Sequence, residues 1–198
     1  YNYMGVPYFF KWLQLTNNTN LIKNILTHNI DYLYFDANCL LHPNVAYIIE
    51  LYNNNKIEGN RKKIEELIWI RIKDYMDDII NRIKPKNICV MIDGVTPIGK
   101  INQQRQRRFK SALSNDDIIN KSKLYPIQSL ELTPDTFYMK RLHKLLKKYC
   151  KEKKYYYSSY LENGEGEHKI IHHIRNLSNK NIIIYGLDAD LLFLSLTI

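Results

Sequence analysis

Cysteines are scarce in this sequence, and their spacing excludes two classes of small domain. The 198 residues contain three, Cys39, Cys89 and Cys150, which lie far apart and form no C-x-x-C pair. That pattern argues against a zinc ribbon and against a disulfide-stapled scaffold. The sequence therefore predicts a reduced, intracellular protein, whose length is sufficient to bury a hydrophobic core without such staples.

Long apolar runs are also absent. The most apolar stretch, residues 182–196, is interrupted by Gly186, Asp188 and Asp190. No run approaches the roughly 20 residues that a membrane-spanning helix needs, and the opening residues YNYMGVP lack the features of a secretory signal. We therefore predict no membrane association through a spanning helix. The sequence has no initial methionine, which indicates a piece of a longer chain.

Basic residues, by contrast, are in excess. Lys and Arg number 29 against 20 Asp and Glu, giving a formal net charge of +9. Such an excess favours a polyanionic partner, either a nucleic acid or an acidic membrane surface. The contents of hydrophobic residues (45%) and charged residues (25%) are those of a globular protein, so the charge belongs to a folded surface.

Hydrophobic periodicity predicts that strands and helices alternate along the chain. Strands are expected at residues 30–35, 88–92, 155–160 and 181–185. Helices are expected at residues 62–83, 100–113, 134–148 and 167–177. The alternation predicts an α/β domain with a mainly parallel central sheet flanked by helices. Residues 114–128 are polar and are predicted to form a mobile surface connection.

Acidic residues follow the ends of three predicted strands and precede one helix. They are Asp36, Asp93, Glu165, Glu167, Asp188 and Asp190. Because open parallel sheets bind ligands beyond the carboxyl ends of their strands, we expect these carboxylates to converge on one rim. Asp188 and Asp190 would share a face of an extended segment, whereas Gly164 and Gly166 allow a tight turn. The alternative is a set of helix caps and surface charges.

Six carboxylates on one rim repel one another unless cations neutralise them. Oxygen donors without cysteine favour Mg²⁺ or Mn²⁺ and argue against zinc. Two such ions about 4 Å apart can activate water and stabilise the attacking and leaving oxygens of phosphodiester hydrolysis. The acidic rim therefore predicts a two-metal nuclease site.

A cationic helix face is predicted beside this rim. Lys100, Gln104, Arg107 and Arg108 stand at i, i+4, i+7 and i+8, which places them on one side of a helix. This face and the helix N-terminus could hold a phosphate next to the carboxylates. A solvated basic stripe is the alternative.

The histidines give weaker signals. His168 and His172 have H-x-x-x-H spacing, with His173 adjacent, but no third ligand of suitable spacing accompanies them, so core or surface positions are expected. His42 follows Asp36 closely and is either an ordinary helix residue or a base-stacking one.

Five short motifs occur in order along the chain. They are MGVPYFFKW (4–12), DAN (36–38) with His42, DGV (93–95) continuing through Arg108 and Phe109, GEGEHKI (164–170) and YGLDADL (185–191). Together they resemble the successive motifs of the Xrn-type 5′→3′ exoribonuclease family. The resemblance implies that residues 1–198 form the amino-terminal lobe of the family's catalytic region, with a fold related to PIN domains and flap endonucleases.

The resemblance also implies roles for the candidate site residues. The six acids would bind Mg²⁺, the four residues of the cationic face would hold a 5′-monophosphate, and His42 would contact the first base. The implied activity is metal-dependent hydrolysis of single-stranded RNA carrying a 5′-monophosphate, in RNA turnover, with the cytoplasm favoured over the nucleus. Family members continue with a further metal-binding Asp and a base-stacking aromatic, so these 198 residues alone are expected to be less active.

Two other functions remain open at this stage. A structure-specific 5′ nuclease of the flap-endonuclease type would cleave branched DNA. A catalytically inactive remnant would bind RNA without cleaving it.

Overall fold

The described part of the chain forms one α/β unit around a four-stranded sheet. The computed structural model describes residues 12, 15–16, 29–96, 98–102, 105–106, 109, 129–188 and 190–198. The strands are β1 (Tyr32–Asp36), β2 (Asn87–Met91), β3 (Tyr156–Ser158) and β4 (Ile182–Tyr185). The helices are α2 (Ala37–Asn53), α3 (Arg61–Ile83), α5 (Phe137–Lys153), α6 (Gly166–Ile174) and α7 (Asp190–Ser195), with a 3-10 turn η1 (Ser129–Leu132).

The sheet has the order β3-β2-β1-β4, and every neighbouring pair is parallel. This arrangement confirms the predicted α/β class with a parallel sheet. The register pairs Asp36 with Met91 and Met91 with Ser158, while Phe35 pairs with Tyr185. All four strands therefore end at the same edge, where the acidic residues were expected.

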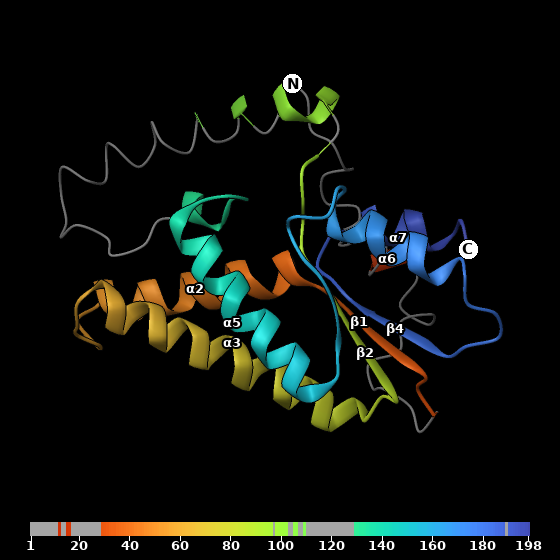
Figure 1. Cartoon of the computed structure of the whole chain (residues 1–198), viewed down its shortest axis with the longest axis horizontal. Helices are drawn as coiled ribbons and strands as arrows, with labels where there is room; N and C mark the ends of the chain where they lie inside the picture. Colours follow the sequence, from red (N-terminus) through yellow and green to blue (C-terminus); the bar gives the residue numbers. More distant parts are fainter. Residues whose placement is uncertain are drawn as a thin grey trace.

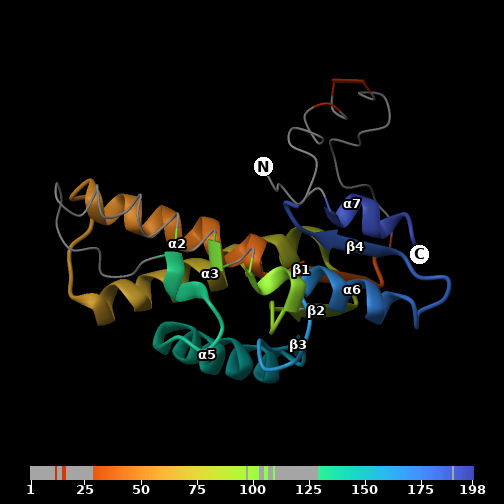
Figure 2. The same ribbon diagram turned by 90° about the horizontal axis from the view of Figure 1, so that it is seen from above.

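Helices cover both faces of the sheet (Figures 1 and 2). Leu33 and Phe35 of β1 and Val90 of β2 point into the larger core, which they share with α2, α3 and α5. Tyr34 and Met91 point to the opposite face and pack against α6. Because successive residues of a strand face opposite sides, burial on both faces requires the continuous apolar runs that β1 and β2 contain.

Helix α2 was not among the helices predicted from periodicity, although a helical position was one expectation for His42; Pro43 lies in its interior. Proline removes one backbone donor and its ring crowds the preceding turn, so a pattern-based prediction stops there. The side chain of Asp36 caps the helix by accepting a hydrogen bond from Asn38 N at 3.2 Å. One apolar face of α2, which includes Leu40, Val45 and Ile48, is buried in the core that α2 shares with α3, and this packing outweighs the local cost of proline.

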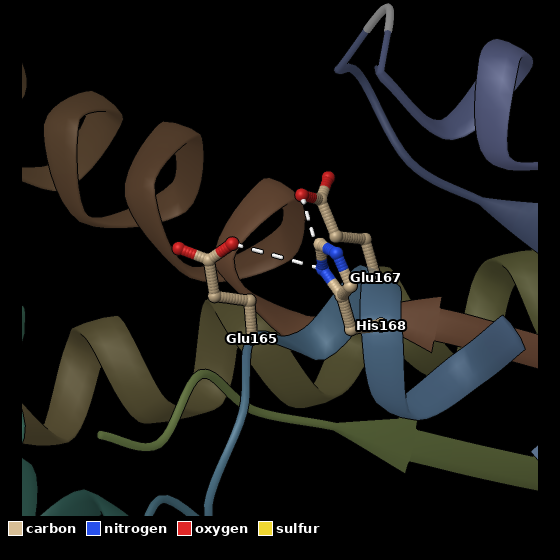
Figure 3. A group of neighbouring side chains, drawn as sticks. All are labelled: Glu165, Glu167 and His168. Atoms are coloured by element: carbon tan, nitrogen blue, oxygen red, sulfur yellow. Dashed lines mark ion pairs between the residues drawn. The ribbon is translucent and has the colours of Figure 1, made fainter. Parts of the chain in front are cut away.

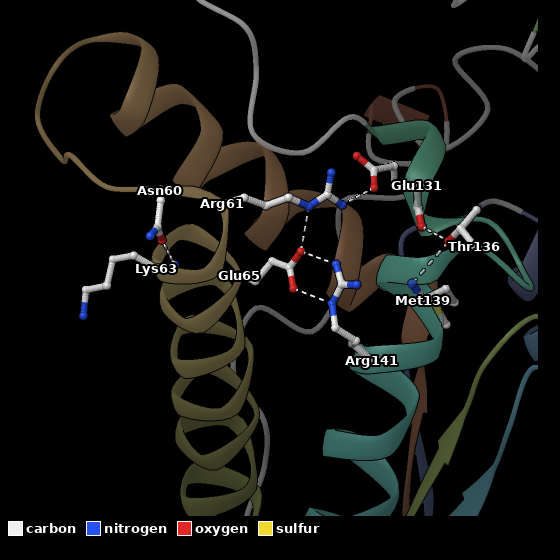
Figure 4. A network of polar contacts seen from close by, with 8 residues as sticks. All are labelled: Asn60, Arg61, Lys63, Glu65, Glu131, Thr136, Met139 and Arg141. Carbon is white, nitrogen blue, oxygen red and sulfur yellow. Dashed lines mark hydrogen bonds and ion pairs between the residues drawn. The ribbon is translucent and has the colours of Figure 1, made fainter.

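A network of ion pairs joins three parts of the helical layer (Figure 4). Glu65 on α3 accepts hydrogen bonds from Arg61 Nε at 2.9 Å and from Arg141 Nε on α5 at 2.7 Å. Arg61 also pairs with Glu131 in η1. Burial acts to raise the pKa of Glu65, but the hydrogen bonds and charges of Arg141 and Arg61 outweigh it, and its pKa lies below the usual value.

The remaining predicted elements agree with the structure to within a few residues, with two qualifications. The predicted strand at residues 155–160 is only the three-residue β3, because the Glu162 carboxylate turns the chain by accepting bonds from Ser158 Oγ and Ser159 N. Of the predicted helix at 100–113, residues 100–102, 105–106 and 109 are helical, and helical structure also includes residues 98 and 99. The rest of this range lies outside the described residues, as does the connection at 114–128. In the described helices, none has the length and hydropathy required to cross a membrane.

Candidate functional site

An open cavity of about 500 Å³ lies at the carboxyl edge of the sheet. It is lined by Asp36, Asn38, Cys39, His42, Pro43, Asp93, Lys100, Glu165, Glu167, Leu187 and Asp188. Five of the six predicted acids thus share one cavity with Lys100 and His42. These residues come from β1 and α2, the segment after β2, the N-terminus of α6 and the segment after β4.

Asp36 is positioned by two elements at once. It ends β1 and caps α2, and its second carboxylate oxygen accepts a hydrogen bond from the Cys39 thiol at 3.1 Å. Burial raises the pKa of Asp36 to about 6, and the charges of Asp93 and Asp188 add to this rise against the bonds from Cys39 and Asn38. A buried carboxylate with a raised pKa is poorly compensated by its own protein.

Asp93 is held by the N-terminus of α6. Gly166 N donates a hydrogen bond to Asp93 Oδ1 at 2.6 Å. Burial raises the pKa of Asp93 in spite of this bond, with a further contribution from the Glu165 charge. Gly166 is also wedged between the acids, because an added Cβ would lie 3.2 Å from Asp36 Oδ1 and from Asp93 Oδ1. A side chain at this position would therefore require its neighbours to shift by a few tenths of an ångström.

Glu165 and Glu167 project into the cavity from the start of α6 (Figure 3). Glu165 occupies the N-cap position but its side chain makes no capping bond, so its carboxylate is available to the cavity. Burial raises the pKa of Glu167 to about 7; Lys100 opposes the rise, and three neighbouring acids reinforce it. Gly164 adopts φ 98°, which supports the predicted turn before this helix.

His168 lies at the surface beside these two glutamates; the surface position was expected, but the contact with the glutamates was not predicted from the sequence. Its Nδ1 lies 3.7 Å from Glu165 Oε2 and 3.6 Å from Glu167 Oε1 (Figure 3). The i, i+3 spacing from Glu165 on the first turn of a helix was the available signal. His173, in contrast, bonds to the Tyr34 hydroxyl at 2.6 Å in the smaller core, as expected for a core histidine.

Asp188 and Asp190 converge with Glu167, but not in the predicted way. One ligand atom from each of these three residues lies within 4.8 Å of the others. The segment is not extended, because Asp190 begins α7 and its backbone N–H donates to Asp188 Oδ1 at 3.1 Å. The prediction of a shared strand face was wrong in geometry, since helix initiation brings the two acids together instead.

Lys100 is the part of the predicted cationic face that the structure describes. It lines the cavity, and its Nζ donates to Glu165 Oε2 at 2.5 Å. Gln104, Arg107 and Arg108 lie outside the described residues. His42 lines the cavity from α2, and partial desolvation lowers its pKa, which favours the neutral ring.

Two further residues support the site and were not singled out from the sequence. The Cys39 sulfur accepts a hydrogen bond from Leu187 N at 3.1 Å while its thiol donates to Asp36, which ties α2 to the segment after β4. Lys169 Nζ donates to the carbonyls of Ile92 and Ser159, each at 2.8 Å, and so connects the ends of β2 and β3.

Comparison with known proteins shows which family the chain belongs to. Residues 4–198 match the family model described as XRN 5'-3' exonuclease N-terminus. The chain belongs to this family. The family membership expected from the five motifs is thereby confirmed, and the parallel sheet with flanking helices is the PIN-like fold of the XRN N-terminal domain.

Relatives of this XRN chain carry exoribonuclease names. It is 33% identical over 222 residues to 5'-3' exoribonuclease 1 of Saccharomyces cerevisiae and 32% identical over 222 residues to 5'-3' exoribonuclease 1 of Homo sapiens. It is 29% identical over 252 residues to 5'-3' exoribonuclease 2 of S. cerevisiae. Each alignment covers 98% of this chain but only 14%, 13% and 24% of these relatives, respectively. The XRN chain thus spans less than a quarter of their length.

Proposed function

We propose that residues 1–198 form the amino-terminal catalytic lobe of a metal-dependent 5′→3′ exoribonuclease that degrades RNA bearing a 5′-monophosphate. One observation carries the proposal: five carboxylates and one lysine line a single cavity at the carboxyl edge of the sheet. The exoribonuclease names of the relatives supply the reaction class.

The donor set of the cavity fits hard divalent cations. Asp36, Asp93, Glu165, Glu167, Asp188 and Asp190 would hold two Mg²⁺ or Mn²⁺ ions, because carboxylate oxygens are the donors these ions prefer. The raised pKa values of Asp36, Asp93 and Glu167 indicate uncompensated negative charge that cations would relieve. When bound, the ions would supply an activated water and stabilisation of the developing charge on phosphate oxygens.

The residues of the chain itself position the substrate. Lys100 would donate to the terminal phosphate, and Gln104, Arg107 and Arg108 would complete a pocket around it. His42 would present its neutral ring to the first base, which suits stacking. Gly166 N and the Cys39 thiol would keep Asp93 and Asp36 aimed at the cavity, as they do through the hydrogen bonds described above.

Selection of the 5′ end follows from a pocket of this kind. Charge-assisted hydrogen bonds favour a single terminal phosphate, and a 5′-hydroxyl would leave the same donors unpaired. RNA with a 5′-monophosphate is therefore the proposed substrate, and single-stranded RNA is its proposed form.

The decisive experiment compares two RNAs of the same sequence, one with a 5′-monophosphate and one with a 5′-hydroxyl. With Mg²⁺, the purified full-length protein should release mononucleotides from the 5′ end of the first, and chelation by EDTA should stop the release. Asp188→Asn should lose this activity, while Asp135→Asn should keep it, because Asp135 is an exposed acid outside the cavity. Internal cleavage, release from the 3′ end, or RNA binding without any cleavage would contradict the proposal.

The compartment is also part of the proposal. Cys39, Cys89 and Cys150 are all free thiols, which supports a reducing, intracellular location, and we propose the cytoplasm. Imaging of the tagged full-length protein in its own cells would test this, and nuclear accumulation would contradict it.

A further inference from the structure

Lys100 forms an ion pair with Glu165 inside the cavity. Its ammonium donates to Glu165 Oε2 at 2.5 Å, and the two side chains are only 22% and 8% exposed. The pair is thus largely shielded from solvent, where ionic interactions are stronger than at the surface. The same lysine is the one proposed to hold the terminal phosphate of the substrate.

The charge of Lys100 acts on more than one acid. Burial raises the pKa values of Asp93 and Glu167, and the charge of Lys100 opposes both rises. Among the described residues that line the cavity, Lys100 is the one lysine or arginine. It therefore serves as a counter-ion within the cavity, while Lys169, which is not part of the lining, also acts to lower the pKa of Asp93.

A divalent cation at these carboxylates would compete with that ammonium. The metal ion and the ammonium are both positively charged, and both would bind the carboxylate oxygens of Glu165. A lysine can leave such a position readily, because it is a point charge on a flexible stem with rotatable donors.

We propose that Lys100 is a displaceable counter-ion: it neutralises Glu165 while the carboxylates lack metal, and it transfers to the terminal phosphate of the nucleotide when a divalent cation occupies them. This inference rests on the proposed function, since it assumes a metal site and a phosphate at the cavity. It also links the two binding events. Metal binding would free Lys100 to contact the phosphate, and phosphate binding would hold Lys100 away from the carboxylates that bind metal.

The coupling must be reciprocal. If metal strengthens phosphate binding through Lys100, phosphate must strengthen metal binding by the same factor. Because the ammonium and the metal would compete for Glu165, removing the ammonium should make the protein bind metal more tightly when nucleotide is absent. A lysine that only binds phosphate would not have this effect.

The first experiment measures Mn²⁺ affinity without nucleotide, by titration with detection of free Mn²⁺ by electron paramagnetic resonance. Lys100→Met should tighten binding by about 5- to 30-fold, a range typical of coupling between sites. Lys100→Gln should act in the same direction, whereas Lys100→Arg keeps the charge and should remain near wild type. Lys148→Met is the matched control, because this lysine lies on α5 away from the cavity. Circular dichroism checks that each variant is folded.

The second experiment measures the affinity for adenosine 5′-monophosphate with and without Mn²⁺, with adenosine as the control ligand. Wild type should bind the monophosphate more tightly in Mn²⁺ and should bind adenosine equally in both conditions. In Lys100→Met, the enhancement by Mn²⁺ should fall by about fivefold or more.

The possible results separate this inference from the proposed function. Unchanged or weaker Mn²⁺ binding in folded Lys100→Met and Lys100→Gln would overturn the inference and leave the metal site intact. An undiminished Mn²⁺ enhancement of monophosphate binding in Lys100→Met would also overturn it. If neither wild type nor any variant bound Mn²⁺, the metal site of the proposed function would fail and the inference with it.

Discussion

Two groups of charged residues in this molecule have opposite electrostatic character. In the helical layer, Glu65 lies between Arg61 and Arg141, and its pKa is lowered (Figure 4). At the sheet edge, acids outnumber cations, and the pKa values of Asp36 and Glu167 are raised to about 6 and 7. The first group is satisfied within the protein and supports the fold. The second is left unsatisfied, which is the arrangement expected of a site that binds a cation.

The largest effect should come from filling the space between the acids. Gly166→Ala would place a methyl group 3.1 Å from the Met91 carbonyl and 3.2 Å from two carboxylate oxygens, so these groups must shift. A shift of a few tenths of an ångström would move Asp36 and Asp93 relative to each other, so the rate should fall, but by less than the roughly 100-fold that a displacement on the order of 1 Å at a reacting centre can cause. Single-turnover release of 5′ mononucleotides would measure it.

Gly99→Ala is the matched control for that substitution. Among the described residues, no atom lies within 4 Å of a Cβ added at Gly99, so activity should stay near that of wild type. Full activity in Gly166→Ala would show that the precise spacing of Asp36 and Asp93 is unimportant.

The next largest effect should be stabilisation of the folded protein by metal bound at the carboxylates of the cavity. A ligand that binds only the folded state at about 100 times its Kd adds about 2.7 kcal/mol to the free energy of unfolding. Saturating Mn²⁺ should therefore raise the melting temperature, and Asp188→Asn should weaken this rise. Scanning calorimetry with and without EDTA measures both.

Asp135→Asn provides the comparison, because Asp135 is exposed and pairs with Lys140 away from the cavity. Its Mn²⁺ response should match that of wild type. An equal loss of response in both variants would indicate general charge effects and not a defined site.

A smaller effect should distinguish the two lysines near the rim. Lys169 bonds to the carbonyls of Ile92 and Ser159 and not to a carboxylate, so it braces the strand ends. Lys169→Met should lower the free energy of unfolding by about 1.5 to 3 kcal/mol, as expected for lost hydrogen bonds to a charged donor. Urea denaturation measures this loss. The Lys169 charge also acts to lower the pKa of Asp93, but this lysine is not among the residues that line the cavity, so Mn²⁺ affinity should change less than in Lys100→Met. An equal tightening in both variants would contradict the bracing role.

The smallest effect concerns the satisfied group in the helical layer. Glu65→Gln should cost about 1 kcal/mol near neutral pH, since partly exposed ion-pair networks contribute modestly. Because the folded pKa of Glu65 is lowered, its stabilisation is present above the ordinary value of 4.5 and is lost as the pH falls through the folded pKa. The difference in unfolding free energy between wild type and variant should therefore shrink on acidification.

Glu66→Gln on the same helix is the control, because Glu66 is exposed and only meets Lys63 at 3.5 Å. Its effect should be close to zero at every pH. A wild-type advantage over Glu65→Gln that grew on acidification would show that Glu65 has no lowered pKa.

Sequence patterns predicted the sheet and its acidic edge for a clear physical reason. Strands β1 and β2 are apolar on both faces, and acids follow them directly, so the run and its end are both visible in the sequence. Parallel pairing then brings those ends together, and this needs no knowledge of side-chain contacts.

Other parts of the site depend on tertiary contacts that no local pattern records. Helix α2 forms in spite of Pro43 because its apolar face is buried. The bonds of Cys39 to Asp36 and Leu187 join segments that are far apart in the sequence. The pairing of Lys100 with Glu165 spans 65 residues, and the sequence offered for this lysine only a phosphate contact or a solvated basic stripe.

The double position of Asp36 determines how an inactive enzyme should be made for trapping RNA. As the last residue of β1 and the cap of α2, it supports the folded chain as well as lining the cavity, so its removal would confound loss of chemistry with loss of structure. Asp188 is exposed, and of the hydrogen bonds described above it accepts only the one from Asp190 N. Asp188→Asn is accordingly the better starting point for a substrate-trapping mutant, since the asparagine side chain can still accept that bond.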